Sequence, residues 1–246
     1  RDAVTLSIPF VASKSDLNVA ILLDRSGSMG SYERWVSAVS GAQGFADLLS
    51  AENDASASND HHAAVMWFRG VGGYDPAQSG PPSFGGAEGT SYGLLHDPDL
   101  AFQKVDSTFA ANVGTHGTAA SPGSTTPIGS GLLYARDKLL EHDGAGTREH
   151  VVLCLSDGME NRGPMILDAT DPGGAWGSNA VRIYSAALGT TSNWADVLGR
   201  ASRQTGGIPS LDVKHIPEMP LDPSAVSPLV QGWFMDRFKA LFGYDP

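Results

Sequence analysis

The sequence has one cysteine, few basic residues and no long hydrophobic run. Cys154 cannot form an internal disulfide, and its position inside an apolar run indicates a small buried side chain. The 16 Lys and Arg residues against 27 Asp and Glu residues give a net charge of −11. That charge repels a phosphate backbone, so we expect no nucleic-acid partner. No stretch approaches the roughly 20 apolar residues of a transmembrane helix, so we expect no membrane span.

The composition is that of an ordinary globular protein. With 41% hydrophobic residues, the chain has enough apolar surface for a real core and too much for disorder. Its first residues include neither an initiating Met nor a signal-peptide hydrophobic region, which indicates a processed chain or a segment of a longer protein. We find no internal repeat and no dividing linker. We therefore expect a single domain over residues 1–246, with a core at about 18–213 and a C-terminal helix at about 227–243.

Strand and helix patterns alternate along the chain, as in βαβ units. The expected strands are residues 18–24, 62–68, 92–95, 150–155, 181–188 and 208–213. The expected helices are residues 32–49, 98–109, 127–140, 193–205 and 227–242. Irregular Gly- and Pro-rich segments are expected at 70–91, 112–125 and 158–180. The pattern predicts a doubly wound α/β fold with a central, mostly parallel sheet and helices on both faces.

A carboxylate and two hydroxyls follow the first buried strand. Residues 19–23 form a continuous apolar run after Asn18, which is typical of a strand buried on both faces, and Asp24 ends this strand. Ser26 and Ser28 follow at every second position. Ligands of open α/β sheets bind outside the carboxyl ends of the strands. These oxygens are hard donors that suit a small divalent cation.

Two further segments are expected at the same edge of the sheet. Asp157 follows the buried strand at 150–155, as Asp24 follows the first strand. The loop that ends in Ser124-Thr125-Thr126-Pro127 offers a hydroxyl just before a helix begins. Because parallel strands present their carboxyl ends at one edge, we expect these groups to lie close together.

The three segments together resemble a known family. Asp-x-Ser-x-Ser, then Thr-Pro-Ile-Gly before a helix, then Leu-Ser-Asp-Gly after a strand, in this order, are similar to the motifs of the von Willebrand factor type A (vWA) domain. The resemblance extends from about residue 19 to 213. It implies a Rossmann-like fold with one antiparallel edge strand and a metal-ion-dependent adhesion site (MIDAS).

The resemblance also implies a role for each residue. Ser26 and Ser28 would bind the metal through their hydroxyls, and Thr126 would do so in one conformational state. Asp24 and Asp157 would act through water. The sequence has Ser124-Thr125 where the family often has Gly-Gly.

The resemblance implies a binding function rather than catalysis. An oxygen-only donor set favours Mg²⁺, Mn²⁺ or Ca²⁺ over zinc or copper, and Mg²⁺ fits best because it keeps several waters. In this family, an Asp or Glu of a protein partner fills the open coordination position. We expect such a partner, no catalytic residue, and an extracellular or cell-surface location in preference to the cytoplasm, within a larger multidomain protein. The three irregular segments would frame the partner-binding face.

The sequence is compatible with several alternatives. The cation could activate water in a metal-assisted hydrolase, or the domain could be only a scaffold in a larger assembly. Asp24 could merely cap a helix, and Asp157 could belong only to a turn. Residues 89–93 match the Gly-x-Ser-x-Gly motif but follow no strand. His61 and His62 could bind a metal, although adjacent strand residues face opposite sides.

Two more interpretations are weaker or concern another part of the chain. Asp24 as the nucleophile of a dehalogenase-like enzyme is disfavoured, because such enzymes have a second Asp where Ser26 stands. The aromatic stripe of the last helix predicts packing against the core. The family resemblance adds the alternative that this helix slides and couples metal occupancy to a neighbouring domain.

Overall fold

The computed structural model describes residues 15–31, 33–70, 92–143, 148–157, 160–174, 176, 181–187, 192–205 and 223–242. Its six strands form one sheet of order β3-β2-β1-β5-β6, with β4 also paired to β2. They are β1 (Leu17–Asp24), β2 (His62–Phe68), β3 (Tyr92–Leu94), β4 (Gln103–Lys104), β5 (Glu149–Ser156) and β6 (Val181–Ala187). Four strands run parallel, whereas β3 and β4 are antiparallel to β2. The predicted mostly parallel sheet with an antiparallel edge strand is confirmed, and the two-residue β4 is an addition.

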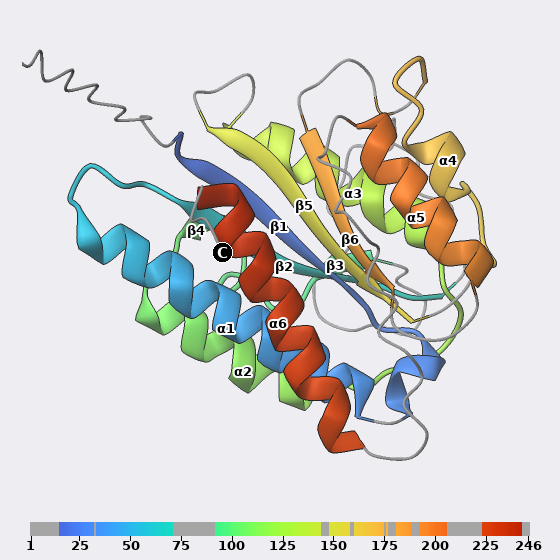
Figure 1. Ribbon diagram of the computed structural model, residues 1–246, viewed down its shortest axis with the longest axis horizontal. Coiled ribbons are helices and arrows are strands. Elements are labelled where there is room, and N and C mark those ends of the chain that lie inside the picture. The colour runs from blue at the N-terminus through green and yellow to red at the C-terminus, as the bar shows by residue number, and fades with distance from the viewer. Residues whose placement is uncertain are drawn as a thin grey trace, which may run out of the picture.

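Helices cover both faces of this sheet, as predicted (Figure 1). They are α1 (Arg34–Ala55), α2 (Ser107–Ala119), α3 (Ile128–Asp143), α4 (Ile166–Ala169), α5 (Ser192–Gln204) and α6 (Pro223–Phe242), with a short 3-10 helix η1 (Gly27–Gly30). Helices α1, α2 and α6 pack on one face, and α3, α4 and α5 on the other. In β1, Ile21 packs in the first layer and Leu22 in the second, which explains the unbroken apolar run.

The predicted helix at 98–109 and irregular segment at 112–125 are partly wrong. Helix α2 begins after Asp106, whose side chain accepts a hydrogen bond from the Phe109 amide at 2.8 Å, and it continues to residue 119. The glycines that suggested a loop instead permit close packing on α1. A Cβ at Gly117 would lie 2.3 Å from Cγ1 of Val39. A glycine inside a helix here indicates contact between helices.

Other boundaries moved by smaller amounts. Helix α1 continues six residues beyond its predicted end at 49, to Ala55, and α6 begins at Pro223 rather than at 227. The short α4 lies within the predicted irregular segment 158–180. The predicted strand at 208–213, most of segment 70–91 and the first three residues of the Gly-x-Ser-x-Gly match lie outside the described residues.

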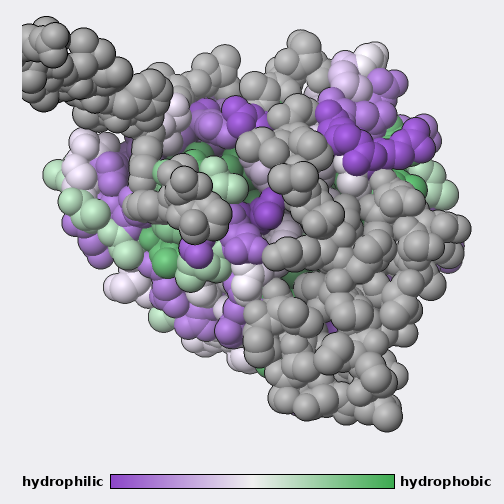
Figure 2. All heavy atoms as spheres, viewed as in Figure 1, coloured by the Kyte–Doolittle hydropathy of each residue, from purple (hydrophilic) through white to green (hydrophobic). Residues whose placement is uncertain are grey.

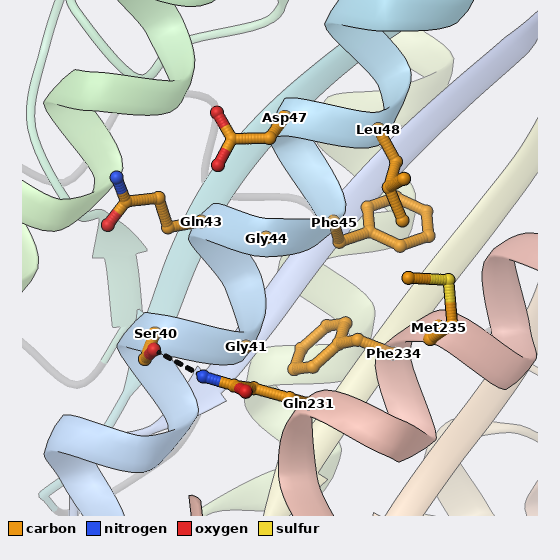
Figure 3. A pocket seen from close by; sticks show the side chains of 10 residues that line it. All are labelled: Ser40, Gly41, Gln43, Gly44, Phe45, Asp47, Leu48, Gln231, Phe234 and Met235. Carbon is orange, nitrogen blue, oxygen red and sulfur yellow. Dashed lines mark hydrogen bonds between the residues drawn. The ribbon is translucent and has the colours of Figure 1, made fainter. Parts of the chain in front are cut away.

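Helix α6 packs along α1, as its aromatic stripe predicted. Phe234 lies over Gly41, where a Cβ would come within 2.5 Å of its ring, and Phe45 contacts the same ring at 6.0 Å between centroids. Gln231 donates a hydrogen bond to the Ser40 hydroxyl at 2.9 Å (Figure 3). A hollow of about 350 Å³ remains along this seam. It is lined only by α1 and α6, so it belongs to helix packing and not to the sheet edge.

The two adjacent histidines at the start of β2 are separated by the sheet. His61 is buried against the Phe242 ring, and its Nδ1 accepts a hydrogen bond from the Leu17 amide at 3.1 Å. His62 instead contacts His142 of α3, with 2.9 Å between Nδ1 and Nε2. They do not converge on one metal, as strand alternation predicted. Cys154 is fully buried, and burial raises the pKa of its thiol far above the usual range.

Several residues of α1 are exposed to solvent. Over the described part of the molecular face drawn in Figure 2, hydrophilic and hydrophobic residues are interspersed. Among the described residues, no helix combines the length and hydropathy needed to cross a membrane.

Candidate metal site at the carboxyl edge

The carboxyl ends of β1 and β5 are neighbours, and each leads to an acidic residue of the predicted site. The two strands pair in parallel up to Leu23 and Leu155. Asp24 ends β1, and Asp157 follows β5 directly. Ser156, the last residue of β5, donates a hydrogen bond from its hydroxyl to Oδ2 of Asp24. The sheet therefore brings the two carboxylates to one edge, as the sequence predicted.

Hydrogen bonds join four of the five predicted residues in one chain. The Ser26 amide donates to Oδ1 of Asp24 at 2.7 Å. The hydroxyls of Ser26 and Ser28 are hydrogen-bonded at 3.1 Å. The Ser28 hydroxyl in turn donates to Oδ1 of Asp157 at 2.7 Å. Asp24 thus holds its own loop in a turn and makes no cap to α1, whose first turn has no side-chain cap.

The loop that carries the fifth residue is docked onto the same turn. The Gly27 amide donates to the carbonyl of Ser124 at 3.0 Å. The Thr125 hydroxyl donates to the carbonyl of Gly70, so it is engaged away from the serines. Thr126 follows and is 4% exposed. This arrangement favours Thr126 over Thr125 as the threonine of the site.

Ser124 has a left-handed backbone, with φ of 73°. This conformation favours glycine, because a Cβ crowds the backbone there. The position is one of the two at which the family often has glycine. The serine therefore adds local strain to the loop that presents Thr126.

Burial and a neighbouring charge perturb the site acids. Asp24 is fully buried, and burial, followed by repulsion from Asp157, raises its pKa to about 7. Hydrogen bonds from Ser156 and Ser26 act in the opposite direction. Asp24 and Asp157 thus repel each other when both are ionised, and a cation at this edge would relieve that repulsion.

Arg34 also belongs to this cluster, and the sequence did not predict it. Its Nη1 donates to Oδ2 of Asp157 at 2.6 Å, and both side chains are buried. Arg34 is the first residue of α1 and follows Glu33, which has a left-handed φ of 55°. An arginine at a helix start normally indicates solvent exposure, so nothing in the pattern indicates this contact.

Two residues of the predicted irregular segment 158–180 also support the site, and the sequence did not indicate them. The side-chain oxygen of Asn161 accepts a hydrogen bond from the Thr126 backbone amide at 3.1 Å. The Asn161 backbone amide in turn donates to the Thr126 carbonyl at 3.2 Å. Glu160 accepts from the amides of Gly129, at 2.6 Å, and Ile166. Burial raises the pKa of Glu160 to about 7. These bonds hold the start of α3, directly after Thr126, against the loop that follows β5.

The donor set fits a hard divalent cation. Asp24, Ser26, Ser28, Thr126 and Asp157 supply carboxylate and hydroxyl oxygens, and neither histidine nor cysteine takes part in the hydrogen-bonded chain described above. Oxygen ligands of this kind suit Mg²⁺, Mn²⁺ or Ca²⁺. Among the ion pairs of the described residues, one cationic side chain, that of Arg34, contacts these acids.

Comparison with known proteins gives a clear result for structure only. No family model and no curated protein matches the sequence. Solved structures do match. A von Willebrand factor type A protein from Catenulispora acidiphila has a TM-score of 0.57 and 13% identity, over 89% of this chain and 42% of that one. The pilus adhesin SpaC from Lactobacillus rhamnosus GG has a TM-score of 0.60 and 13% identity, over 92% and 31%.

A third similar structure is that of a metal-loaded relative of the fold. It is proximal thread matrix protein 1 from the mussel byssus with a zinc-occupied MIDAS motif. Its TM-score is 0.54 and its identity 14%, over 90% of this chain and 48% of that one. The chain therefore spans less than half the length of each of the three structures. With its sheet order, its helices on both faces and these neighbours, the chain has the von Willebrand factor type A fold.

Proposed function

We propose that this chain is a divalent-cation-dependent protein-binding module. A cation, Mg²⁺ in preference to Mn²⁺ or Ca²⁺, is held by the oxygens of Asp24, Ser26, Ser28, Thr126 and Asp157. The observation that carries the proposal is the hydrogen-bonded chain that links Asp24 to Asp157 through the backbone amide and hydroxyl of Ser26 and the hydroxyl of Ser28. It gathers hard donors at the carboxyl edge of a parallel sheet, where ligands of such folds bind.

The partner group is a carboxylate. The cation supplies positive charge at a protein surface whose net charge of −11 otherwise repels acidic ligands. A site with few protein ligands leaves a coordination position for an Asp or Glu of another protein. The proposal assigns binding and no catalytic step. The adhesin and matrix proteins among the similar structures support an adhesive role at an extracellular location or cell surface, and we propose residues 1–246 as one domain of a larger protein.

A calorimetric titration of Mg²⁺ into the metal-stripped chain tests the site. Ser28→Ala removes one ligand hydroxyl at an exposed position, and we expect Mg²⁺ to bind at least about tenfold more weakly. Ser31→Ala removes an exposed hydroxyl three residues further on and is the matched control. Equal Mg²⁺ affinity in wild type and Ser28→Ala would remove the site assignment.

The partner chemistry has a separate test. Peptides that contain one Asp should bind the Mg²⁺-loaded chain, and the matched Asn peptides should not. The Asp peptides should also fail to bind in EDTA. Equal binding of Asp and Asn peptides would leave a metal site without carboxylate recognition.

A further inference from the structure

A second cluster of candidate ligands lies on other elements, between β3 and β4 and on α2. His96 Nδ1 and His116 Nε2 both face Oδ2 of Asp99, at 3.5 Å and 2.9 Å. The three candidate ligand atoms lie within 4.8 Å of one another. The two imidazole rings are stacked, with 3.7 Å between centroids and 13° between their planes, so a rotation of the 44% exposed His96 ring is needed for both nitrogens to direct their lone pairs at one ion. No residue of this cluster takes part in the proposed Mg²⁺ site.

The backbone positions two of the three ligands rigidly. His96 and Asp99 lie in a helical turn closed by a hydrogen bond from the Leu100 amide to the His96 carbonyl, at 3.0 Å. Leu100 is fully buried. Its carbonyl accepts a hydrogen bond from the Val65 amide of β2 at 3.0 Å. The turn is therefore anchored to the sheet.

The third proposed ligand, His116, lies on α2, which is held against α1. His116 precedes Gly117, whose carbonyl accepts a hydrogen bond from the Trp35 indole at 2.9 Å. Gly117 also packs directly against Val39 of α1. The backbone of His116 is thus held against α1. Two rigid elements present the cluster, and its side chains are 22–44% exposed, so an ion can reach it from solvent.

The spacing fits a tetrahedral ion. Ligands at about 2.05 Å from a tetrahedral Zn²⁺ lie about 3.3 Å from one another. The separations between the imidazole nitrogens and the Asp99 oxygen, 2.9 Å and 3.5 Å, bracket that value, and the two nitrogens lie within 4.8 Å of each other. Imidazole suits zinc, copper and nickel, whereas Mg²⁺ and Ca²⁺ take oxygen ligands. We propose that His96, Asp99 and His116 bind a divalent transition-metal ion, with Zn²⁺ the best match, and leave its fourth position to water.

A second histidine pair provides a matched comparison. His62 and His142 are as close as the proposed ligands, with 2.9 Å between their nitrogens, and Asp60 lies beside them. Here Arg148 is ion-paired with Asp60 and has its Nη2 3.5 Å from His62 Nε2. A guanidinium at this position repels a metal ion and occupies the carboxylate. Both clusters contain two histidines and one aspartate. Within the described part of the chain, Asp60 is ion-paired with Arg148, whereas the ion pairs of Asp99 are with the two histidines alone.

Calorimetric titration of Zn²⁺ in excess Mg²⁺ tests the proposal on the full chain. Mg²⁺ occupies oxygen sites and does not compete for imidazole. We expect one Zn²⁺ per chain in wild type, binding at least about tenfold more weakly to His96→Gln and to His116→Gln. His142→Gln should bind Zn²⁺ as wild type does.

Two outcomes would overturn the proposal. One is the absence of Zn²⁺ binding by wild type in excess Mg²⁺, and the other is weaker binding in His142→Gln with full binding in His96→Gln. His96 is a surface residue, so its variant carries the test if His116→Gln does not fold. Asp24→Ala removes the proposed Mg²⁺ site and should leave Zn²⁺ binding intact, so failures of the two sites are distinguishable.

Discussion

Replacing Arg34 by Met should make Mg²⁺ bind more tightly while destabilising the metal-free protein. Arg34 donates to Asp157 at 2.6 Å, in a pair whose side chains are 10% and 0% exposed. Removing one partner of a buried ion pair costs about 3–5 kcal/mol, because the remaining charge loses its compensation. The metal-free Arg34→Met protein should lose stability of this order.

Mg²⁺ should recover part of this loss. A divalent cation beside Asp157 compensates the same carboxylate, so the metal-bound variant loses less stability than the metal-free variant. Unfolding and Mg²⁺ binding form one thermodynamic cycle, so the difference between these two losses of stability equals the change in Mg²⁺ binding free energy. A hydrogen bond to a charged group contributes about 1.5–3 kcal/mol, so a gain of that size corresponds to roughly 10- to 100-fold tighter Mg²⁺ binding.

The assay combines denaturant unfolding, with and without saturating Mg²⁺, with calorimetric titration. Arg182→Met is the control, since it removes the same charge from a pair with Glu149, at 3.0 Å and at the opposite edge of the sheet. Arg182 is 38% exposed, so its loss should cost less than about 1 kcal/mol and leave Mg²⁺ affinity unchanged. Unchanged or weaker Mg²⁺ binding by Arg34→Met would refute competition between guanidinium and metal.

Three further predictions concern the pH response, the loop and the helix seam. Burial raises the Asp24 pKa from 3.8 to about 7, so between these values the folded metal-free chain binds more protons than the unfolded chain. Asp24 alone should therefore lower the free energy of unfolding by roughly 4 kcal/mol as pH rises from 4 to 8, in addition to the similar effect of Glu160, whose pKa burial also raises. An Asp24→Asn variant whose stability falls as steeply as that of wild type in matched titrations would contradict the cause. Ser124→Gly should raise the melting temperature, because it removes the strain of a non-glycine residue in the left-handed conformation, up to about 1 kcal/mol. A lower melting temperature would mean that the serine carries no strain. Gly41→Ala should cost about 1–3 kcal/mol of unfolding free energy, because the added Cβ meets the Phe234 ring. Gly44→Ala, on the same helix but with no atom within 4 Å of the added Cβ, should stabilise the protein by about 0.5–1 kcal/mol. Equal effects of the two substitutions would exclude packing between α1 and α6 as the cause.

The carboxyl edge was predictable because its signals are local and strong. A buried parallel strand has an apolar run without alternation, so the ends of β1 and β5, and hence Asp24 and Asp157, follow directly from the sequence. Rules for parallel sheets then bring the two acids together. The structure reproduces that placement, whereas their role as metal ligands remains a proposal.

The parts that were missed depend on contacts between distant segments. Gly114 and Gly117 predicted a loop, but tertiary packing against α1 requires small residues at these positions of α2. Arg34 and Glu160 are charged residues that a pattern assigns to solvent. Their partners, Asp157 and the amides that start α3 and α4, lie far away in sequence or in an irregular segment. Periodicity carries no information on such pairs.

Each acid of the proposed site has a positive partner of its own. With its pKa raised to about 7, Asp24 holds a proton below neutral pH, and Asp157 is paired with the guanidinium of Arg34. One proton and one guanidinium supply two positive charges, the same number that Mg²⁺ brings. Bound Mg²⁺ would replace these two positive charges. Its binding should therefore release a proton from Asp24 and weaken the Arg34–Asp157 contact at the same time. Because both changes act on one site, the effects of Asp24→Asn and Arg34→Met on Mg²⁺ affinity should not be additive.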